Sequence, residues 1–114
     1  SAAIRSKIWI EAGGEVLLSE WRIDLLAAIE ETGSLTRAAE RLDVPYRTAW
    51  ERVREMERRL GTTLVETASG GADGGGSRLS PFGSDLVARW RRASGGIRRE
   101  IETRFRAAFG DLLG

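Results

Sequence analysis

The stretch GSLTRAAERLDVPYRTAWERV, residues 33–53, holds two short helical patterns separated by a break of three residues. Ser34 is a good helix N-cap. An apolar face follows it at helical spacing and comprises Leu35, Ala38, Ala39 and Leu42. The break ends on Pro45, and proline is tolerated in the first turn of a helix and hardly elsewhere in it. We therefore predict that a second helix begins near Pro45.

The apolar residues of this stretch are spaced as two helices crossing at a steep angle require. The Ala-Ala pair at 38–39 leaves room for a close approach, and Leu42 and Val44 can fill the corner between the helices. Ala49 and Val53 then face back onto the first helix. Short crossed helices of this kind place their second member in the major groove of DNA. The stretch therefore predicts a helix-turn-helix.

Helical spacing continues on both sides of this motif. On the N-terminal side, Ser19 is a predicted N-cap and Gly33 a predicted helix end. The apolar face between them comprises Trp21, Leu25, Ala28 and Ile29. On the C-terminal side, Gly61 ends the second helix of the motif. The buried stripe of that helix comprises Ala49, Val53, Met56 and Leu60.

Two pairs of short strands accompany the helices. Residues 6–18 alternate polar and apolar side chains around Gly13-Gly14, which predicts a β-hairpin. Residues 63–67 and 77–80 are read as a second pair of strands. They are joined by a loop at 69–76 that contains five glycines. A strand pair that follows the second helix of the motif forms a wing.

Together these elements predict one domain over residues 1–114, mainly α with small β elements. The fold class is a winged helix-turn-helix with an N-terminal β-hairpin and a long C-terminal dimerisation helix. The parts in order are the hairpin at 6–18, the helix-turn-helix at 34–60, the wing at 63–80 and the C-terminal helix at 81–112.

The predicted C-terminal helix carries a long apolar stripe. Apolar or small residues recur at steps of three or four at Phe82, Leu86, Trp90, Ala93, Ile97, Ile101, Phe105, Ala108 and Leu112. One small domain has little core left to cover such a stripe, so we expect it to pack against the same helix of a second chain. The expected dimerisation residues are Trp21, Leu86, Trp90, Ile97 and Ile101. Gly95-Gly96, in the middle of the stripe, permits either a close helix crossing or a break.

The composition argues against an enzyme. The chain contains no histidine and no cysteine, which removes the commonest general base, the commonest metal ligand and any thiolate. Lys7 is its single lysine. A carboxylate pair such as Glu30-Glu31 would have to carry catalysis, and no further residues support such a site. We expect no metal and no cofactor in this chain.

The bulk charge does not indicate a nucleic-acid partner, because the formal net charge is only +1. Arginine dominates the 18 basic residues and suits bidentate recognition of phosphate and guanine, although a GC-rich genome gives the same bias. No apolar run approaches the roughly 20 residues that span a bilayer. No signal peptide is visible. We therefore expect no membrane partner and a cytoplasmic protein.

The predicted helix faces indicate which residues contact double-stranded DNA. Side chains opposite the buried stripe of the second helix should meet base edges, and these are Tyr46, Arg47, Thr48 and Trp50. The start of the first helix suits phosphate contacts through Ser34, Thr36 and Arg37. Arg54 and Arg58 lie further along the second helix, toward the DNA backbone. Arg78, at the base of the wing, is placed to reach a phosphate or the minor groove.

Several of these assignments have alternatives. Arg54 and Arg58 could instead pair with Glu51 and Glu55 on a solvated face. Trp50 lies beside the buried stripe and could be half-buried, and Tyr46 could belong to the core. The glycines of the 69–76 loop could bring the backbone close to DNA, or the loop could make no contact.

Several distinctive short segments lie within residues 20–90. They are Tyr46-Arg47-Thr48-Ala49-Trp50, Leu64-Val65-Glu66, the glycines at 70–71 and 74–76, and Leu79-Ser80 with Gly83. This combination resembles the N-terminal DNA-binding domain of the ModE family of molybdate-responsive transcriptional regulators. A weaker resemblance is to the LysR-type winged helix-turn-helix, which shares the Ala-Ala helix, the Leu-Gly before the wing strand and the long linker helix.

The resemblance to ModE implies a dimeric regulator that binds a palindromic operator and controls molybdate transport or other molybdenum-related genes. In that family a separate C-terminal domain binds molybdate, and we expect no such domain within these 114 residues. Pro45 departs from the serine typical of the family at the start of the recognition helix, which removes a capping hydroxyl. The alternative function is a winged helix used for protein–protein assembly without specific DNA binding.

Overall fold

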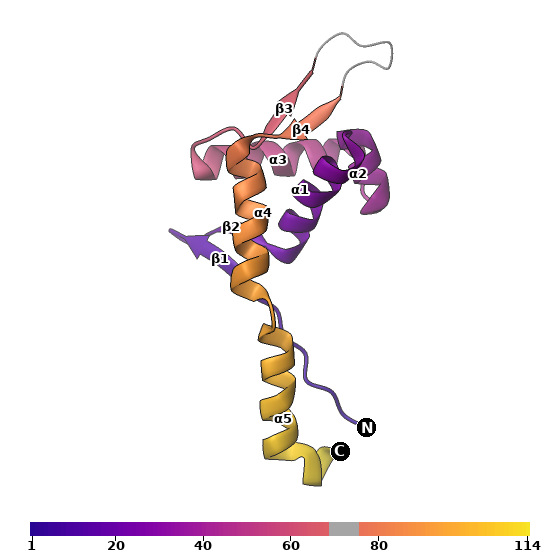
Figure 1. The fold of residues 1–114 in the computed structure, drawn as a ribbon, viewed down its shortest axis with the longest axis vertical. Helices are drawn as coiled ribbons and strands as arrows, with labels where there is room; N and C mark the ends of the chain where they lie inside the picture. The colour runs from indigo at the N-terminus through magenta and orange to yellow at the C-terminus, as the bar shows by residue number, and fades with distance from the viewer. Residues whose placement is uncertain (69–75) are drawn as a thin grey trace.

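The computed structural model describes residues 1–68 and 76–114. Its helices are α1 (Glu20–Thr32), α2 (Leu35–Arg41), α3 (Tyr46–Leu60), α4 (Pro81–Ser94) and α5 (Ile97–Leu113). Its strands are β1 (Trp9–Ala12), β2 (Glu15–Ser19), β3 (Val65–Thr67) and β4 (Ser77–Leu79). Up to α4 this is the predicted order, and the fold is the predicted winged helix-turn-helix (Figure 1).

Local capping residues determine where the helices begin and end. The hydroxyl oxygens of Ser19, Ser34 and Ser80 each accept a hydrogen bond from the backbone N–H three residues further on, at 3.0–3.2 Å. Gly33 and Gly61 end α1 and α3 in the left-handed conformation, with φ of 69° and 71°. The assignments of Ser19, Ser34, Gly33 and Gly61 from the sequence are confirmed.

Helix α3 begins without a side-chain cap. Pro45 occupies the N-cap position with φ of −59°, and Tyr46 is the first helical residue. The fixed φ of proline suits this helix start, but its side chain has no oxygen to accept a backbone N–H. The buried stripe is as predicted, with Ala49, Val53 and Met56 all inside.

One hydrophobic core lies between the first three helices, the wing base and α4. The largest fully buried side chains are Leu25, Leu26, Ile29, Met56 and Leu64. Ala38 and Ala39 of α2 are also buried, which lets α2 and α3 pack closely in the crossed arrangement that the sequence predicts. The core therefore fixes the position of α3 against α1 and α2.

Two antiparallel strand pairs flank this core. β1 pairs with β2 around Gly13-Gly14, whose φ angles of 58° and 80° fit a tight two-residue turn. β3 pairs with β4 to form the wing. The predicted glycine-rich wing tip, except for Gly76, lies outside the described residues. At the wing base, the Ser77 N–H donates to the carbonyl of Gly33 at 2.9 Å.

The C-terminal region corrects one prediction. A single helix over 81–112 is absent, and α4 and α5 are separated at Gly95-Gly96. Gly96 has φ of 83°, a left-handed conformation that interrupts the helical hydrogen bonds and that glycine adopts at little cost. Of the two alternatives that the glycine pair permits, the structure has the break.

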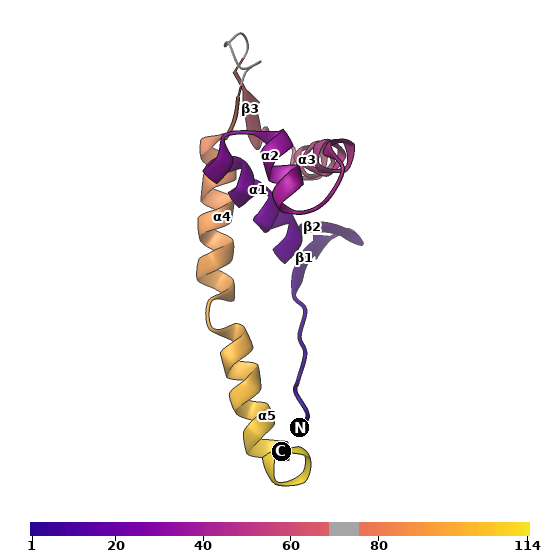
Figure 2. The same cartoon turned by 90° about the vertical axis from the view of Figure 1, so that its right-hand side faces the viewer.

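Helix α5 extends away from the core. Figures 1 and 2 show the wing at one end of the molecule and α5 with both termini at the other, over a longest extent of 61 Å. In both views the N-terminal residues run beside α5, and the Ala2 N–H donates to the carbonyl of Leu113 at 3.2 Å. No residue of α5 is buried.

Candidate nucleic-acid interface

The outer face of α3 presents large aromatic and basic side chains. Tyr46 is 51% exposed and Trp50 44% exposed, and the side chain of Arg47 is 86% exposed. Thr48 is half-buried at the edge of this face. Neither aromatic residue belongs to the core, because Ala49 and Val53 occupy the inner side of the helix. Most of the predicted base-contacting residues therefore share one accessible face.

Arg54 continues this face one turn beyond Trp50. Its guanidinium carbon lies 5.4 Å from the centre of the Trp50 ring, within the range of a cation–π contact. Its Nη1 donates to Oε1 of Glu57 at 2.8 Å. The guanidinium is therefore held between an aromatic ring and a carboxylate while half of the side chain remains exposed.

The N-terminus of α2 follows Gly33, to which the wing base is hydrogen-bonded. Thr36 and Arg37 are exposed in its first turn. Ser34 is half-buried, and its Oγ already accepts the N–H of Arg37 at 3.1 Å. A hydroxyl that accepts one hydrogen bond can still donate its own proton. A phosphate at this helix end would also meet free backbone N–H groups.

Arg78 projects from the wing, on β4. Its side chain is 82% exposed, and its Nε lies 3.4 Å from Oε1 of Glu66 on the paired strand. An exposed pair of this kind contributes about 0–1 kcal/mol, so a phosphate can compete for the guanidinium. The predicted approach of the wing-tip glycines to DNA concerns residues outside the described ranges.

Arg54 and Arg58 do not pair with Glu51 or Glu55, as one alternative expected. Arg54 pairs with Glu57, whereas Glu51 lies 3.7 Å from Arg47. Arg58 is exposed, and within residues 1–68 and 76–114 it takes part in no ion pair. The outer face of the helix therefore keeps accessible guanidinium groups available for phosphate or base edges.

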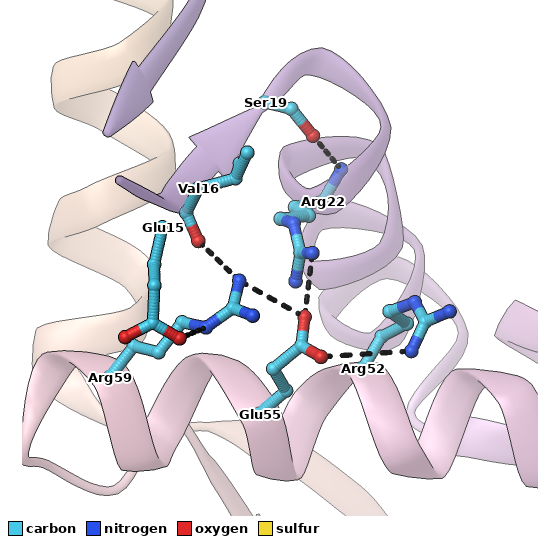
Figure 3. A network of polar contacts seen from close by, with 7 residues as sticks. All are labelled: Glu15, Val16, Ser19, Arg22, Arg52, Glu55 and Arg59. Atoms are coloured by element: carbon cyan, nitrogen blue, oxygen red, sulfur yellow. Dashed lines mark hydrogen bonds and ion pairs between the residues drawn. The ribbon is translucent and has the colours of Figure 1, made fainter. Parts of the chain in front are cut away.

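The opposite side of α3 carries a structural ion network (Figure 3). Oε1 of Glu55 accepts from Nη2 of Arg22 at 2.6 Å and lies 3.3 Å from Nη1 of Arg59. Arg59 also donates to the carbonyl of Val16 at 2.8 Å and to Glu15 at 3.1 Å. These contacts attach the β1–β2 hairpin and α1 to α3.

Burial and neighbouring charges act in opposite directions on Glu55. Burial alone would raise the pKa of its carboxyl group. The hydrogen bond and charge of Arg22, with the charges of Arg59 and Arg52, outweigh burial and hold the pKa of Glu55 below its ordinary value. The second terminal nitrogen of Arg22, Nη1, is buried without a hydrogen-bond partner among the described residues.

The expected dimerisation residues differ in where they lie. Trp21, Leu86, Ile97 and Ile101 are half-buried within the single chain. Trp90 is only 8% exposed and belongs to the core cluster. It has little surface to offer a second chain, because α4 packs it against its own domain. The structure therefore gives Trp90 a core role.

The described residues contain no group of three or more potential metal ligands from histidine, cysteine, aspartate and glutamate. Within the same ranges, none of the helices is both long and apolar enough to cross a membrane.

Sequence reasoning missed three contacts of this region. Oε2 of Glu57 accepts the N–H groups of Leu64 and Val65 at 2.8 and 3.2 Å, which joins α3 to the wing. The spacing of Arg54 and Glu57 could have indicated their ion pair. No sequence pattern indicates that a carboxylate accepts backbone N–H groups at the start of a strand seven residues away. Nor does any pattern indicate that the carbonyl of Gly33 accepts an N–H from the wing.

An exposed basic and aromatic helix, set by a helix-turn-helix and flanked by a wing, defines a winged helix-turn-helix nucleic-acid-binding domain. The family model described as "Bacterial regulatory helix-turn-helix protein, lysR family" matches residues 22–84, more than half of the chain. The chain belongs to this family. The family is one of regulatory proteins, in agreement with the prediction of a regulator rather than an enzyme.

Curated relatives confirm the resemblance to ModE. The chain is 38% identical over 82 residues to the molybdenum-pterin-binding protein MopB of Rhodobacter capsulatus, covering 72% of this chain and 30% of that protein. It is 40% identical over 74 residues to the molybdenum transport protein ModE of Azotobacter vinelandii, covering 65% and 27%. It is homologous to these proteins and spans less than a third of their length.

Solved structures support the same fold. The DNA-binding domain of CbnR in complex with DNA matches with a TM-score of 0.63 and 25% identity, covering 80% of this chain and 98% of that chain. ArgP from Mycobacterium tuberculosis matches with a TM-score of 0.54 and 26% identity, covering 73% and 29%.

Proposed function

We propose that this chain is a sequence-specific DNA-binding domain of a transcriptional regulator, and that it acts on double-stranded DNA as a homodimer. The observation that carries this proposal is the exposed face of α3. Tyr46, Arg47, Trp50 and Arg54 lie accessible there while the opposite face is fixed in the core. A rigid helix with such side chains suits insertion into the major groove.

The contacts divide into two kinds. Arg47 suits bidentate hydrogen bonding to guanine, and the rings of Tyr46 and Trp50 offer apolar contact to thymine methyl groups. Arg37 on α2 and Arg78 on the wing are exposed and suit phosphate contacts, which orient the domain without reading sequence. Binding of this kind weakens as salt rises.

The proposed targets are genes of molybdate transport or molybdenum use. Support comes from the homologous regulators, one of which is described as the DNA-binding transcriptional dual regulator ModE of Escherichia coli. Such a regulator acts in the bacterial cytoplasm, where its operator DNA lies. Molybdate recognition forms no part of the function proposed for these residues.

The homodimer would form along α5. This helix has 17 residues and no buried side chain in the single chain, so packing against its own domain stabilises it little. Ile97, Ile101 and Phe105 recur along one edge of it, and all three are half-buried. Two copies would bring two recognition helices to a palindromic site.

The test is the substitution Arg47→Ala, with Arg106→Ala as its control. Both remove one exposed arginine, but Arg106 lies on α5, away from the recognition helix. We expect Arg47→Ala to reduce affinity for operator DNA by about tenfold or more, and Arg106→Ala to leave it nearly unchanged. Fluorescence anisotropy with operator and scrambled duplexes measures both. Equal losses in the two variants, or none, would favour a winged helix used for protein assembly.

A further inference from the structure

Glu57 joins the two parts of the molecule that would touch DNA. It lies on α3, and its side chain is only 11% exposed. Oε1 accepts from Nη1 of Arg54 at 2.8 Å, whereas Oε2 accepts from the N–H groups of Leu64 and Val65 at 2.8 and 3.2 Å. One carboxylate therefore contacts an arginine of the recognition helix and the first residues of the wing.

The wing needs this carboxylate because of where β3 begins. Leu64 is fully buried and Val65 nearly so, so their N–H groups are withdrawn from water. A buried N–H without a partner costs about 1–3 kcal/mol. Glu57 supplies the acceptor, and the position of β3 relative to α3 is thereby fixed.

The second strand of the wing is fixed to the helix-turn-helix in a similar way. The N–H of Ser77 on β4 donates to the carbonyl of Gly33 at 2.9 Å. Gly33 directly precedes Ser34, the N-cap of α2. A Cβ atom on Gly76 would lie 3.2 Å from the same carbonyl oxygen, so the backbones meet closely here. Both wing strands are thus attached to the helix-turn-helix, β3 to α3 and β4 to the residue before the N-cap of α2.

Arg54 is oriented by the same arrangement. Its guanidinium is hydrogen-bonded to Glu57 on one side and lies over the ring of Trp50, 5.4 Å from its centre. A guanidinium that is oriented before binding loses less conformational entropy when it forms directional hydrogen bonds. The geometry therefore favours recognition of bases or of one defined phosphate over a mobile charge contact.

We propose that Glu57 is a positioning residue that sets Arg54 and the wing in one fixed arrangement, and that this arrangement contributes to DNA sequence selectivity rather than to nonspecific affinity. This inference rests on the proposed function. It assigns a role in DNA selectivity to an acidic side chain that is only 11% exposed.

The substitution Glu57→Gln tests it. All three partners of Glu57 are donors, and a glutamine has one acceptor oxygen and one donor amide, so it cannot satisfy both sides. We expect the ratio of operator affinity to scrambled-DNA affinity to fall about tenfold, the size of one well-placed base contact. Affinity for scrambled DNA should stay within about twofold, because no DNA-facing cation is lost.

Glu55→Gln is the matched control. It removes the same charge from the same helix and breaks the Arg22 contact, but it touches neither Arg54 nor the wing. It should lower thermal stability and leave the selectivity ratio unchanged. A general loosening of α3 would instead lower the ratio in both variants, and this would overturn the proposal.

Arg54→Lys keeps the test decisive if Glu57→Gln does not fold. Lysine retains the charge but lacks the planar group that pairs with Glu57 and stacks on Trp50. We expect it to lose selectivity, and in combination with Glu57→Gln the two losses should not add. Unchanged selectivity in Arg54→Lys overturns the proposal. A wild-type protein that does not distinguish operator from scrambled DNA overturns the proposed function as well.

Discussion

Gly83, in the first turn of α4, is where that helix comes closest to the wing. A Cβ atom there would lie 2.6 Å from the backbone carbonyl oxygen of Leu64, which is closer than van der Waals contact allows. The absence of a side chain therefore lets α4 pack directly against the residue that enters β3. This close approach, together with the hydrogen bond from the Ser80 N–H to the same carbonyl at 2.8 Å, holds the start of α4 against the wing base.

Replacing Gly83 with alanine should lower the free energy of unfolding by about 1–3 kcal/mol, because the helix and the wing base must separate. Gly110→Ala on α5 is the control. No atom lies within 4 Å of a Cβ at that position, so helix propensity should make it neutral or stabilising by up to about 1 kcal/mol. Urea denaturation compares the two. Equal effects would show that the close approach at Gly83 does not matter.

The ion network of Glu55 makes a prediction about acid stability. Because the folded state lowers the pKa of Glu55, its contribution is fully present above the ordinary value of 4.5 and is lost as pH falls through the folded pKa. Asp24 has the opposite sign, since burial, followed by the charge of Glu20, raises its pKa. We therefore expect wild type to lose more stability than Glu55→Gln between neutral pH and the folded pKa. Parallel pH profiles from urea denaturation would contradict this.

At the scale of single residues, the sequence predicts features that depend on neighbours within the same helix. The accessible arginines of α3 could be predicted from helical spacing, whereas spacing left the exposure of Tyr46 and Trp50 open. The role of Glu57 could not be predicted, because its partners Leu64 and Val65 are backbone groups brought near by the turn after Gly61. Trp90 was placed at a dimer surface because spacing alone does not say which side of a stripe its own core covers.

The individual elements are largely determined by their caps. Three serines begin α1, α2 and α4, and two glycines end α1 and α3, and each such signal is readable from the sequence. The break after α4 is different, because a glycine pair suits both a helix crossing and a helix end. The left-handed φ of Gly96 decides between them, and the glycine pair alone does not indicate that angle.

The cap of α2 can be tested directly. Ser34→Ala removes the acceptor for the Arg37 N–H and should lower the free energy of unfolding by about 1 kcal/mol. Thr36→Ala is the control, because Thr36 is exposed and lies inside the same helix, where alanine is at least as favourable. Thermal unfolding of both variants gives the comparison. A loss as large in Thr36→Ala would mean that the cap is not the cause.

At the scale of the whole molecule, the proposed DNA-contacting surface and the proposed dimerisation helix lie toward opposite ends of the longest axis. The wing and the N-termini of α2 and α3 belong to one end, and α5 extends toward the other over an extent of 61 Å. DNA contact and self-association can therefore occur without competing for surface. Overall topology was predictable because strand and helix signals alternate clearly, whereas the direction of α5 depends on the break at Gly95-Gly96.

Self-association through α5 predicts a difference between its two faces. Ile101→Glu places a charge on the apolar edge and should convert a dimer to a monomer, with a parallel loss of operator affinity. Thr103→Glu adds the same charge on the opposite, exposed face and should leave the dimer intact. Sedimentation equilibrium reports both masses. A monomeric wild type, or a dimeric Ile101→Glu, would place the interface elsewhere or exclude it.

The most direct measurement of the central claim is a binding isotherm of wild-type protein on a palindromic fragment from a molybdate-operon promoter and on the same fragment scrambled, at two salt concentrations. We predict binding to the palindrome that is tighter by about a hundredfold or more and that weakens with salt on both DNAs. Equal, salt-sensitive binding to the two fragments would contradict sequence-specific recognition by α3.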